Sequence, residues 1–355
     1  MRVLAITNMY PTAAFPGRGV FVHEQIQGLR AIGLAVRVLF IDRWHEGPWA
    51  YYRVGPKLAE ALAEFGPDLI HVMYGGVMAD QVVRRAHGRP VVVTFHGSDL
   101  LGEPLSGGLR RLSAAYGVHC SRRAARRAQG VVVVAQHLVR ALRRAVHPAK
   151  LRVIPCGIDL GRFQPLDSTG CKRQLGWDPS SFHVLFASSN GDPVKRPWLA
   201  EAAVASLNRS SPTAVLHHLT GIPNERVPIW LSASDVLLLT SQHEGSPTVV
   251  KEALACGLPV VSVDVGDVAE RLTGITGCFL AAAEPEDLSR KLQCVQQRRP
   301  RLECRARLAE LSTTQIAQRL RRHYEQVTAG SSGPIAGGDA TADYPSPERL
   351  RQPVA

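Results

Sequence analysis

Two glutamates with seven residues between them, Glu244 and Glu252, stand in a stretch whose residue types suit the binding of phosphates and hydroxyls. The apolar run 236–239 predicts a buried strand shortly before Glu244. Ser246 is a suitable N-cap and Pro247 suits the first helical position, so a helix is predicted to begin at about residue 247. The unit therefore reads as strand, turn, helix and parallel strand, with the helix N-terminus at the carboxyl end of the first strand.

The predicted start of this helix is a suitable place for a phosphate group. The first turn of a helix leaves backbone N–H groups without partners, and the helix dipole adds partial positive charge there. Thr248 and Val249 offer such donors, whereas Pro247 has none. Glu252 lies more than one turn into the predicted helix, where its carboxylate could accept hydrogen bonds from two hydroxyls. Two isolated glutamates are more often solvated, so their spacing alone does not settle the function.

A second loop, after a strand predicted at 184–187, carries two adjacent basic residues, Lys195 and Arg196. Solvated surface cations are the commonest outcome for such residues. The functional alternative is a clamp in which both cations stabilise a departing diphosphate. The sequence has no Asp-x-Asp pair of the kind that holds a divalent metal, so we expect chemistry without metal or cofactor.

The stretch 244–261, EGSPTVVKEALACGLPVV, resembles the E-x7-E signature of retaining glycosyltransferases with the GT-B fold, glycosyltransferase family four. Its Gly-Ser-Pro start is similar to that of bacterial cell-surface polysaccharide transferases. The resemblance extends over about residues 1–327. It implies that Glu252 holds the ribose hydroxyls of a nucleotide-sugar and that Glu244 lies near the transferred sugar, with Ser246 to Val249 lining the donor site.

The same resemblance assigns roles in two other loops. Lys195 matches a family lysine that stabilises the leaving diphosphate, but the family's arginine position falls near Asn190, so Arg196 is only a substitute. His96, in TFHGSD, matches a histidine that contacts the transferred sugar or the acceptor. Its position at a strand end fits a structural role equally well. Asp99 is expected either to orient His96 or to cap the next helix.

The segment Pro16-Gly17-Arg18-Gly19 resembles the glycine loop that follows the first strand in this family. Gly17 and Gly19 would let the backbone approach a sugar diphosphate, and Arg18 would contact a phosphate or the acceptor. A Gly-x-Gly pattern alone is weak, but this one follows a strand predicted at 2–7 and opens a helix predicted at 20–32.

Alternating strands and helices along the chain predict an α/β fold with two doubly wound parallel-sheet, Rossmann-like domains that face each other across a cleft. We expect an acceptor-binding domain at 1–160 and a nucleotide-sugar-binding domain at 161–312. A helix at 313–329 is predicted to return to the first domain, and 330–355 reads as a disordered tail because it is rich in Gly, Ser, Pro and Asp. Residues 44–54 lack clear periodicity and are predicted to form a loop.

The net charge of +12 is confined to one half of the chain. Residues 1–165 hold 22 Lys and Arg against 10 Asp and Glu, so the remaining half is neutral. Four arginines in the segment SRRAARRA, 121–128, fall on one stripe of a predicted helix at 109–129. An anionic membrane surface would attract this stripe, although a solubilising face explains it equally well. No interleaved aromatics or helix-turn-helix pattern surround it, so no nucleic-acid partner is expected.

The cysteine content and the hydropathy of the sequence indicate the cellular compartment of the protein. The seven cysteines are scattered and contain no C-x-x-C pair, which suits reduced thiols in a cytoplasmic enzyme. No apolar run approaches the ~18 residues of a membrane-spanning helix. We therefore expect a cytoplasmic protein, peripheral to the inner face of the cell membrane.

The function predicted from these features is metal-independent transfer of a hexose, with retention, from a nucleotide-diphosphate-sugar to a cell-surface glycan or lipid-linked acceptor. Two alternatives remain open from the sequence. One is a nucleotide-sugar epimerase of the same fold, which would turn over the donor without an acceptor. The other is a basic nucleic-acid-binding protein, whose binding would fall steeply with salt.

Overall fold

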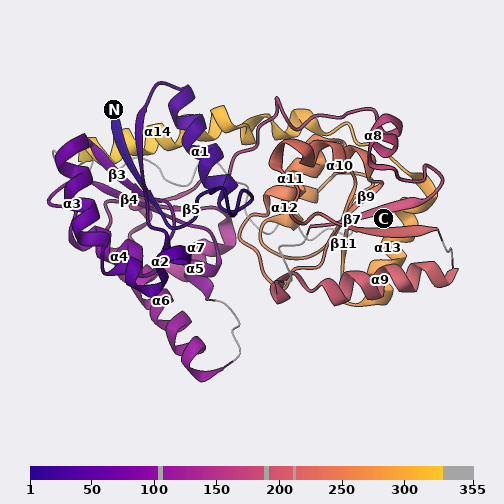
Figure 1. Cartoon of the computed structure of the whole chain (residues 1–355), viewed down its shortest axis with the longest axis horizontal. Coiled ribbons are helices and arrows are strands. Elements are labelled where there is room, and N and C mark those ends of the chain that lie inside the picture. The colour runs from indigo at the N-terminus through magenta and orange to yellow at the C-terminus, as the bar shows by residue number, and fades with distance from the viewer. Residues whose placement is uncertain (103–106, 188–191, 211–212, 331–355) are drawn as a thin grey trace.

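The computed structural model describes residues 1–102, 107–187, 192–210 and 213–330, and it contains two separate parallel sheets (Figure 1). The sheet of the N-terminal half has the strand order β2-β1-β3-β4-β5-β6. Its strands are β1 (Arg2–Thr7), β2 (Ala35–Phe40), β3 (Leu69–Val72), β4 (Val91–Phe95), β5 (Gly130–Val133) and β6 (Leu151–Val153). Every pairing is parallel, as predicted for a doubly wound sheet.

The sheet of the C-terminal half has the order β11-β10-β9-β7-β8 and is also entirely parallel. Its strands are β7 (Phe182–Phe186), β8 (Ala214–His218), β9 (Val236–Leu239), β10 (Val260–Val263) and β11 (Phe279–Ala281). Strands β7, β9 and β10 are buried along their whole length, which explains their nearly continuous apolar sequences. The predicted fold class is confirmed.

Helices pack around both sheets. In the N-terminal half they are α1 (Val20–Ala31), α3 (Val54–Phe65), α4 (Gly76–Arg84), α5 (Ser98–Leu101), α6 (Gly108–Arg127) and α7 (Gln136–Leu142). In the C-terminal half they are α8 (Ser168–Leu175), α9 (Pro197–Ser210), α10 (Val227–Ala233), α11 (Thr248–Ala255), α12 (Val268–Leu272) and α13 (Pro285–Arg298). The elements α5, α8, α12 and β11 were not predicted from the sequence, because α5, α12 and β11 are very short and α8 contains few apolar residues.

The strand order reverses once in each sheet. In the first sheet β1 lies between β2 and β3, and in the second β7 lies between β8 and β9. Ligands of doubly wound sheets bind outside the carboxyl ends of the strands at such a reversal. The loops that follow β1, β3, β7 and β9 are therefore the segments that position a site.

The prediction of a loop at 44–54 was wrong. This segment holds α2 (Arg43–Glu46), the 3-10 helix η1 (Gly47–Tyr51) and the start of α3. The Asp42 carboxylate accepts hydrogen bonds from the backbone N–H groups of Trp44 and His45, 3.2 and 3.1 Å away, and so caps α2. Trp44 is 56% exposed and Trp49 69% exposed, so no buried periodicity marks these short helices.

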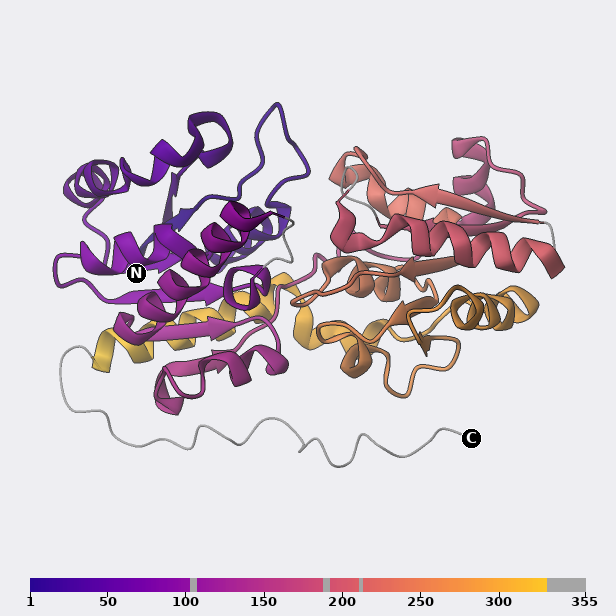
Figure 2. The ribbon, with the colours of Figure 1, turned by 90° about the horizontal axis from the view of Figure 1, so that it is seen from below.

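Helix α14 (Thr313–Gly330) leaves the C-terminal half and packs against the N-terminal sheet, where Figures 1 and 2 show it in yellow. The Tyr324 hydroxyl lies 2.7 Å from His71 Nδ1 in the centre of that sheet, and Gly28 of α1 lies against Thr313 and Ala317. The backbone of Ile158, in the linker between the halves, hydrogen-bonds to Leu311 and Thr313, next to the start of α14. The two segments by which the chain passes between the halves therefore meet at Ile158. The predicted disorder of 330–355 concerns residues that, apart from Gly330, lie outside the described part of the chain.

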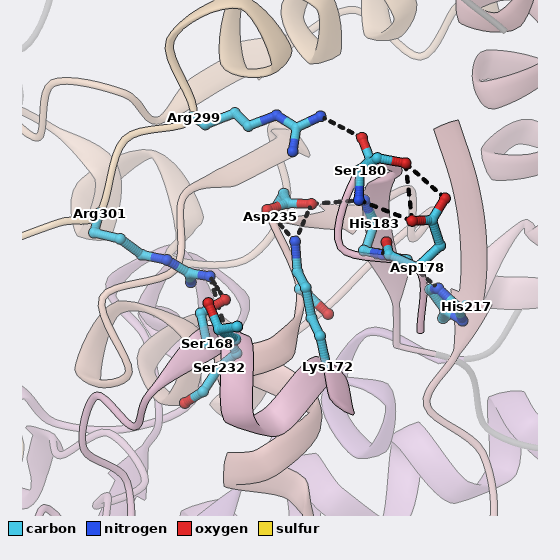
Figure 3. Close-up of polar contacts among 12 residues, drawn as sticks. Ser168, Lys172, Asp178, Ser180, His183, His217, Ser232, Asp235, Arg299 and Arg301 are labelled. Carbon is cyan, nitrogen blue, oxygen red and sulfur yellow. Dashed lines mark hydrogen bonds and ion pairs between the residues drawn. The ribbon is translucent and has the colours of Figure 1, made fainter. Parts of the chain in front are cut away.

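A buried polar network fastens the amino ends of β7 and β9 (Figure 3). Asp235 precedes β9, and its carboxylate accepts hydrogen bonds from Lys172 Nζ at 3.0 Å and from the His183 backbone N–H at 2.8 Å. Lys172 belongs to α8, so one carboxylate joins a helix to two strands. These residues lie at the end of the sheet opposite to the loops expected to hold a ligand, which indicates a structural role.

Candidate active site

The predicted helix after Glu244 is α11, and it begins at Thr248 with Pro247 as the N-cap residue. The prediction that Ser246 caps this helix was wrong. Its hydroxyl donates to Asp267 Oδ2, 2.8 Å away, and accepts from Lys251 Nζ at 3.0 Å. Thr248 and Val249 are half-buried in the first turn, where backbone N–H groups and the helix dipole favour an anion.

Lys195 and Glu244 come from the loops after β7 and β9, and the structure brings them together. Lys195 Nζ lies 2.6 Å from Glu244 Oε1, with the side chains 24% and 15% exposed. Lys195 ends the 3-10 helix η3 (Pro193–Lys195), and its carbonyl accepts from Thr240 Oγ1 at 2.7 Å. The ion pair therefore lies at the strand-order reversal of the second sheet. Both side chains are accessible to solvent, and Thr240 holds the backbone of Lys195.

Arg196 does not lie as the predicted diphosphate clamp requires. Its Nε donates to the Thr240 carbonyl at 2.6 Å and its NH2 group to the Ser241 carbonyl at 3.0 Å. The residue has a φ of 51°, the left-handed conformation that turns the chain from η3 into α9. Arg196 thus anchors the loop after β7 to the end of β9.

Glu252 is half-buried at the junction of the two halves. Burial raises the pKa of its carboxyl to about 7, with Lys251 and Arg162 opposing the shift and Glu24 adding to it. Glu24 belongs to α1, and its Oε1 lies 2.8 Å from Arg162 NH2 in the linker between the halves. Glu252 therefore sits close to charges of the other half and changes its protonation near neutral pH.

His96 follows β4 and points into a buried aromatic setting. Its ring stacks on Tyr74 with centroids 5.9 Å apart, and Nδ1 lies 3.8 Å from Cys156 Sγ. Nε2 is buried and has no hydrogen-bond partner among the residues that the structure describes. Burial lowers the pKa of His96 to about 4, so the imidazole is neutral at pH 7, with one ring nitrogen that donates a hydrogen bond and one that accepts.

Asp99 orients the loop around His96 rather than the imidazole itself. One carboxylate oxygen accepts from the backbone N–H groups of His96 at 3.0 Å and Gly97 at 2.9 Å, and the other from Gly75 at 2.8 Å. Burial raises the pKa of Asp99 to about 6, and these three hydrogen bonds oppose the shift. The side chain joins the loops after β3 and β4.

The His96 loop meets the Glu244 loop across the two halves. A Cβ atom placed on Gly245 would lie 1.8 Å from the His96 carbonyl oxygen, and one on Gly97 would lie 3.1 Å from Gly245 N. Only residues without a side chain allow this approach. The fold therefore brings His96 of one half beside Glu244 of the other.

Gly19 and Arg18 of the predicted glycine loop are accounted for by contacts with other residues of the N-terminal half. Gly19 has a φ of 66°, and a Cβ there would lie 2.4 Å from the Met9 carbonyl carbon, so only glycine fits. Gly17 is exposed and has nothing within 4 Å of a Cβ position. The Arg18 guanidinium lies 4.1 Å from the ring centroids of both Phe15 and Trp44, which holds it in a cation–π sandwich.

Lys251 was missed in the sequence, where it reads as an ordinary helix residue before Glu252. The side chain is fully buried, and Nζ donates to the Cys156 carbonyl at 2.9 Å as well as to Ser246 Oγ. Burial lowers the pKa of Lys251. Only its position inside the E-x7-E unit could have signalled a role, because burial cannot be read from one lysine.

The described residues contain no group of His, Cys, Asp or Glu side chains that could hold a metal ion. None of the helices in that part of the chain is sufficiently long and apolar to cross a membrane.

Two family models match the chain, one on each half. Residues 12–162 match the model described as Glycosyltransferase Family 4, and residues 181–297 match the model described as Glycosyl transferases group 1. The chain is thus a glycosyltransferase, and its N-terminal half is similar to family 4. The enzyme is 29% identical over 335 residues to the glycosyltransferase TuaC of Bacillus subtilis, whose name refers to teichuronic acid biosynthesis; the match covers 76% of this chain and 82% of TuaC.

A shorter match relates the glycosyltransferase to D-inositol 3-phosphate glycosyltransferase of Segniliparus rotundus, at 30% identity over 37% of this chain and 36% of the relative. Two solved structures share its fold. Sucrose-phosphate synthase from Thermosynechococcus elongatus superposes with a TM-score of 0.75 at 18% identity, over 93% of this chain and all of that chain. Anabaena HepE in complex with UDP and glucose gives 0.69 at 17% identity, over 91% and 99% of the two chains. The two-sheet architecture is thus the GT-B fold.

Proposed function

We propose that this glycosyltransferase transfers a hexose, with retention and without a metal ion, from a nucleotide-diphosphate-sugar to a cell-surface glycan or lipid-linked acceptor. The observation that carries the proposal is the ion pair of Lys195 and Glu244 at the strand-order reversal of the second sheet, next to the N-terminus of α11. HepE, which shares the fold, was solved with UDP-glucose, and TuaC is named for teichuronic acid biosynthesis. Both facts support the choice of donor and acceptor class.

Each residue of the C-terminal site contributes a different contact with the donor in this proposal. The backbone N–H groups of Thr248 and Val249 bind the diphosphate, and Glu252 accepts hydrogen bonds from the ribose hydroxyls. Lys195 exchanges part of its contact with Glu244 for the departing phosphate, whose charge grows as the glycosidic bond breaks. Glu244 lies beside the transferred sugar on this scheme.

The acceptor side of the reaction belongs to the N-terminal half. The neutral imidazole of His96 donates to, or accepts from, a hydroxyl of the transferred sugar or of the acceptor, since its buried Nε2 has no other described partner. The departing phosphate takes the proton of the attacking hydroxyl, so no carboxylate nucleophile is needed. Asp99 and Arg196 act only by positioning loops.

The test is donor selection followed by transfer. A panel of nucleotide-sugars is screened for a rise in the melting temperature, because a ligand that binds the folded state stabilises it. The donor that binds is then supplied, carrying a labelled sugar, with glycan or lipid-linked acceptors from cell envelopes, and NMR assigns the anomeric configuration of the product. Donor turnover that needs no acceptor would identify an epimerase, and an inverted product would contradict retention.

A further inference from the structure

Helix α6 carries an unusual solvent face. Its N-terminal turns extend away from the N-terminal sheet, as Figure 1 shows. The positions Leu112, Tyr116, His119 and Arg126 follow the spacing i, i+4, i+7 and i+14, which places them on one side of the helix. Leu112 is 68% exposed and Tyr116 56% exposed. The opposite side, with Ala124 and other small residues, is buried against the protein.

A groove lined by five arginines lies between α6 and the end of α7. The arginine groove consists of Arg122, Arg126, Arg140, Arg143 and Arg144, together with Ala141 and Ala145, and has a volume of about 470 Å³. All five arginines are exposed, and none of them forms an ion pair with any residue that the structure describes. Like charges so close together repel one another, so an anion in the groove would stabilise them.

The other two arginines of the SRRAARRA segment have a structural role. Arg123 Nε and Arg127 NH1 lie 3.5 and 3.4 Å from Asp80 Oδ1, and Arg84 NH2 lies 2.9 Å from Asp80 Oδ2. The Asp80 side chain is 1% exposed, so it needs these cations in the folded protein. The four arginines predicted to act as one stripe therefore divide into a structural pair and a pair that belongs to the arginine groove.

We propose that the arginine groove and the exposed Leu112 and Tyr116 together form a docking surface for an anionic lipid bilayer. The groove fits lipid phosphates, and an apolar and an aromatic side chain on the same helix suit the headgroup region. A nucleic acid or an acidic glycan would engage the arginines but gains nothing from Leu112. Helix α5, which follows the His96 loop, packs against both α6 and α7, so docking holds the acceptor half at the surface. The inference rests on the proposed function only for its lipid-linked acceptor.

The experiment is co-sedimentation of the full chain with vesicles of phosphatidylcholine alone or with added phosphatidylglycerol. Two charge variants, R122Q/R126Q and R143Q/R144Q, are compared with R321Q/R322Q, which removes two exposed arginines from α14. Each arginine near an anionic leaflet contributes about fivefold to partitioning, so each groove variant should bind about 25-fold more weakly. The α14 control should bind like the wild type, and binding should weaken as salt is raised.

A third variant, L112S/Y116S, tests the lipid specifically. It should reduce vesicle binding severalfold while leaving binding to heparin or duplex DNA unchanged. Melting temperature and nucleotide-sugar affinity are measured for every variant and should match the wild type, so a failure here is distinct from a failure of the proposed function. Equal pelleting of the wild type and both groove variants would overturn the docking surface. Retention of full vesicle binding by L112S/Y116S would show that the arginine groove binds the bilayer alone, and would remove Leu112 and Tyr116 from the docking surface.

Discussion

Lys195 is the residue on which the proposed chemistry depends most. Its Nζ lies 2.6 Å from Glu244 Oε1, at the place where the two loops of the second sheet converge. In the proposed reaction a cation at this place would favour the transition state, in which the diphosphate carries more charge than in the bound donor. It can do so without a metal ion, since the ammonium group supplies the charge directly.

Replacing Lys195 with Ala should lower kcat by about 100-fold or more while weakening donor binding much less. Steady-state kinetics and donor calorimetry of the variant give the two numbers. EDTA should leave the wild-type rate unchanged. A wild-type activity that EDTA abolishes and magnesium restores would refute the metal-free scheme.

Glu252 provides a test of donor binding. Glu252→Ala should weaken nucleotide-sugar affinity by roughly 10- to 100-fold, because a hydrogen bond to a charged group contributes about 1.5–3 kcal/mol. Isothermal calorimetry with the folded variant measures the loss. An unchanged dissociation constant would remove Glu252 from the site.

The raised pKa of Glu252 also predicts how stability depends on pH. The pKa is raised from 4.5 to about 7, so between these values the folded state holds a proton that the unfolded chain has released. Wild-type stability should therefore fall as pH rises through this window, relative to Glu252→Gln, which cannot ionise. Urea unfolding of both proteins at several pH values checks the difference. Parallel stability curves would show that Glu252 titrates normally.

At the scale of elements, Lys251 joins α11 to the linker between the halves. Its two hydrogen bonds fix the Cys156 carbonyl and the Ser246 hydroxyl, and Ser246 in turn binds Asp267, which Arg271 holds at 2.9 Å. This network lies directly under the Glu244 loop. Lys251 is therefore a positioning residue, since its fully buried side chain cannot touch a substrate.

Lys251→Met keeps a side chain of similar volume and removes the desolvation cost of a buried ammonium, but it also removes the hydrogen bonds to the Cys156 carbonyl and the Ser246 hydroxyl. We expect kcat to fall more than tenfold as the loop loses its support, with Ser246→Ala causing a smaller loss in the same direction. Circular dichroism and the melting temperature establish folding before the kinetics are measured. A folded Lys251→Met enzyme with the wild-type kcat would exclude this role.

At the scale of the whole molecule, loops of the two halves contact each other at Gly97 and Gly245. The linker and the segment before α14 pair at Ile158, which gives one region about which the halves can move. The His96 and Glu244 loops touch in the described arrangement, so the site is complete only when the halves are close. Donor binding is expected to favour this closed form, and nucleotide should make the small-angle scattering profile more compact.

Gly245→Ala should hold the halves apart. The added Cβ would lie 1.8 Å from the His96 carbonyl oxygen, a distance that only separation of the loops relieves. We expect a larger radius of gyration and strongly reduced transfer. Gly117→Ala, in α6 with nothing within 4 Å, is the matched control and should behave like the wild type. Identical scattering and activity of the two variants would contradict the contact.

The sequence by itself determined the parallel α/β fold and the candidate loops, because both depend on local patterns. Apolar runs followed by polar turns predict strands such as β9, and the E-x7-E spacing located Glu244 and Glu252 on one strand–helix unit. Lys195, in the loop after another strand, was found in the same way. The fold class and the candidate loops can be predicted from the sequence because the residues concerned are neighbours along the chain.

Only the tertiary structure decided which side chains of the loops are available to bind a ligand. Arg196 binds two carbonyls just after β9, and Ser246 binds Asp267 rather than capping α11. Lys251 became significant only when its burial was known, and the arginines of α6 divided between Asp80 and the arginine groove. Each outcome depends on the desolvation and pairing of groups that are far apart in sequence, and no spacing along the chain encodes those distances.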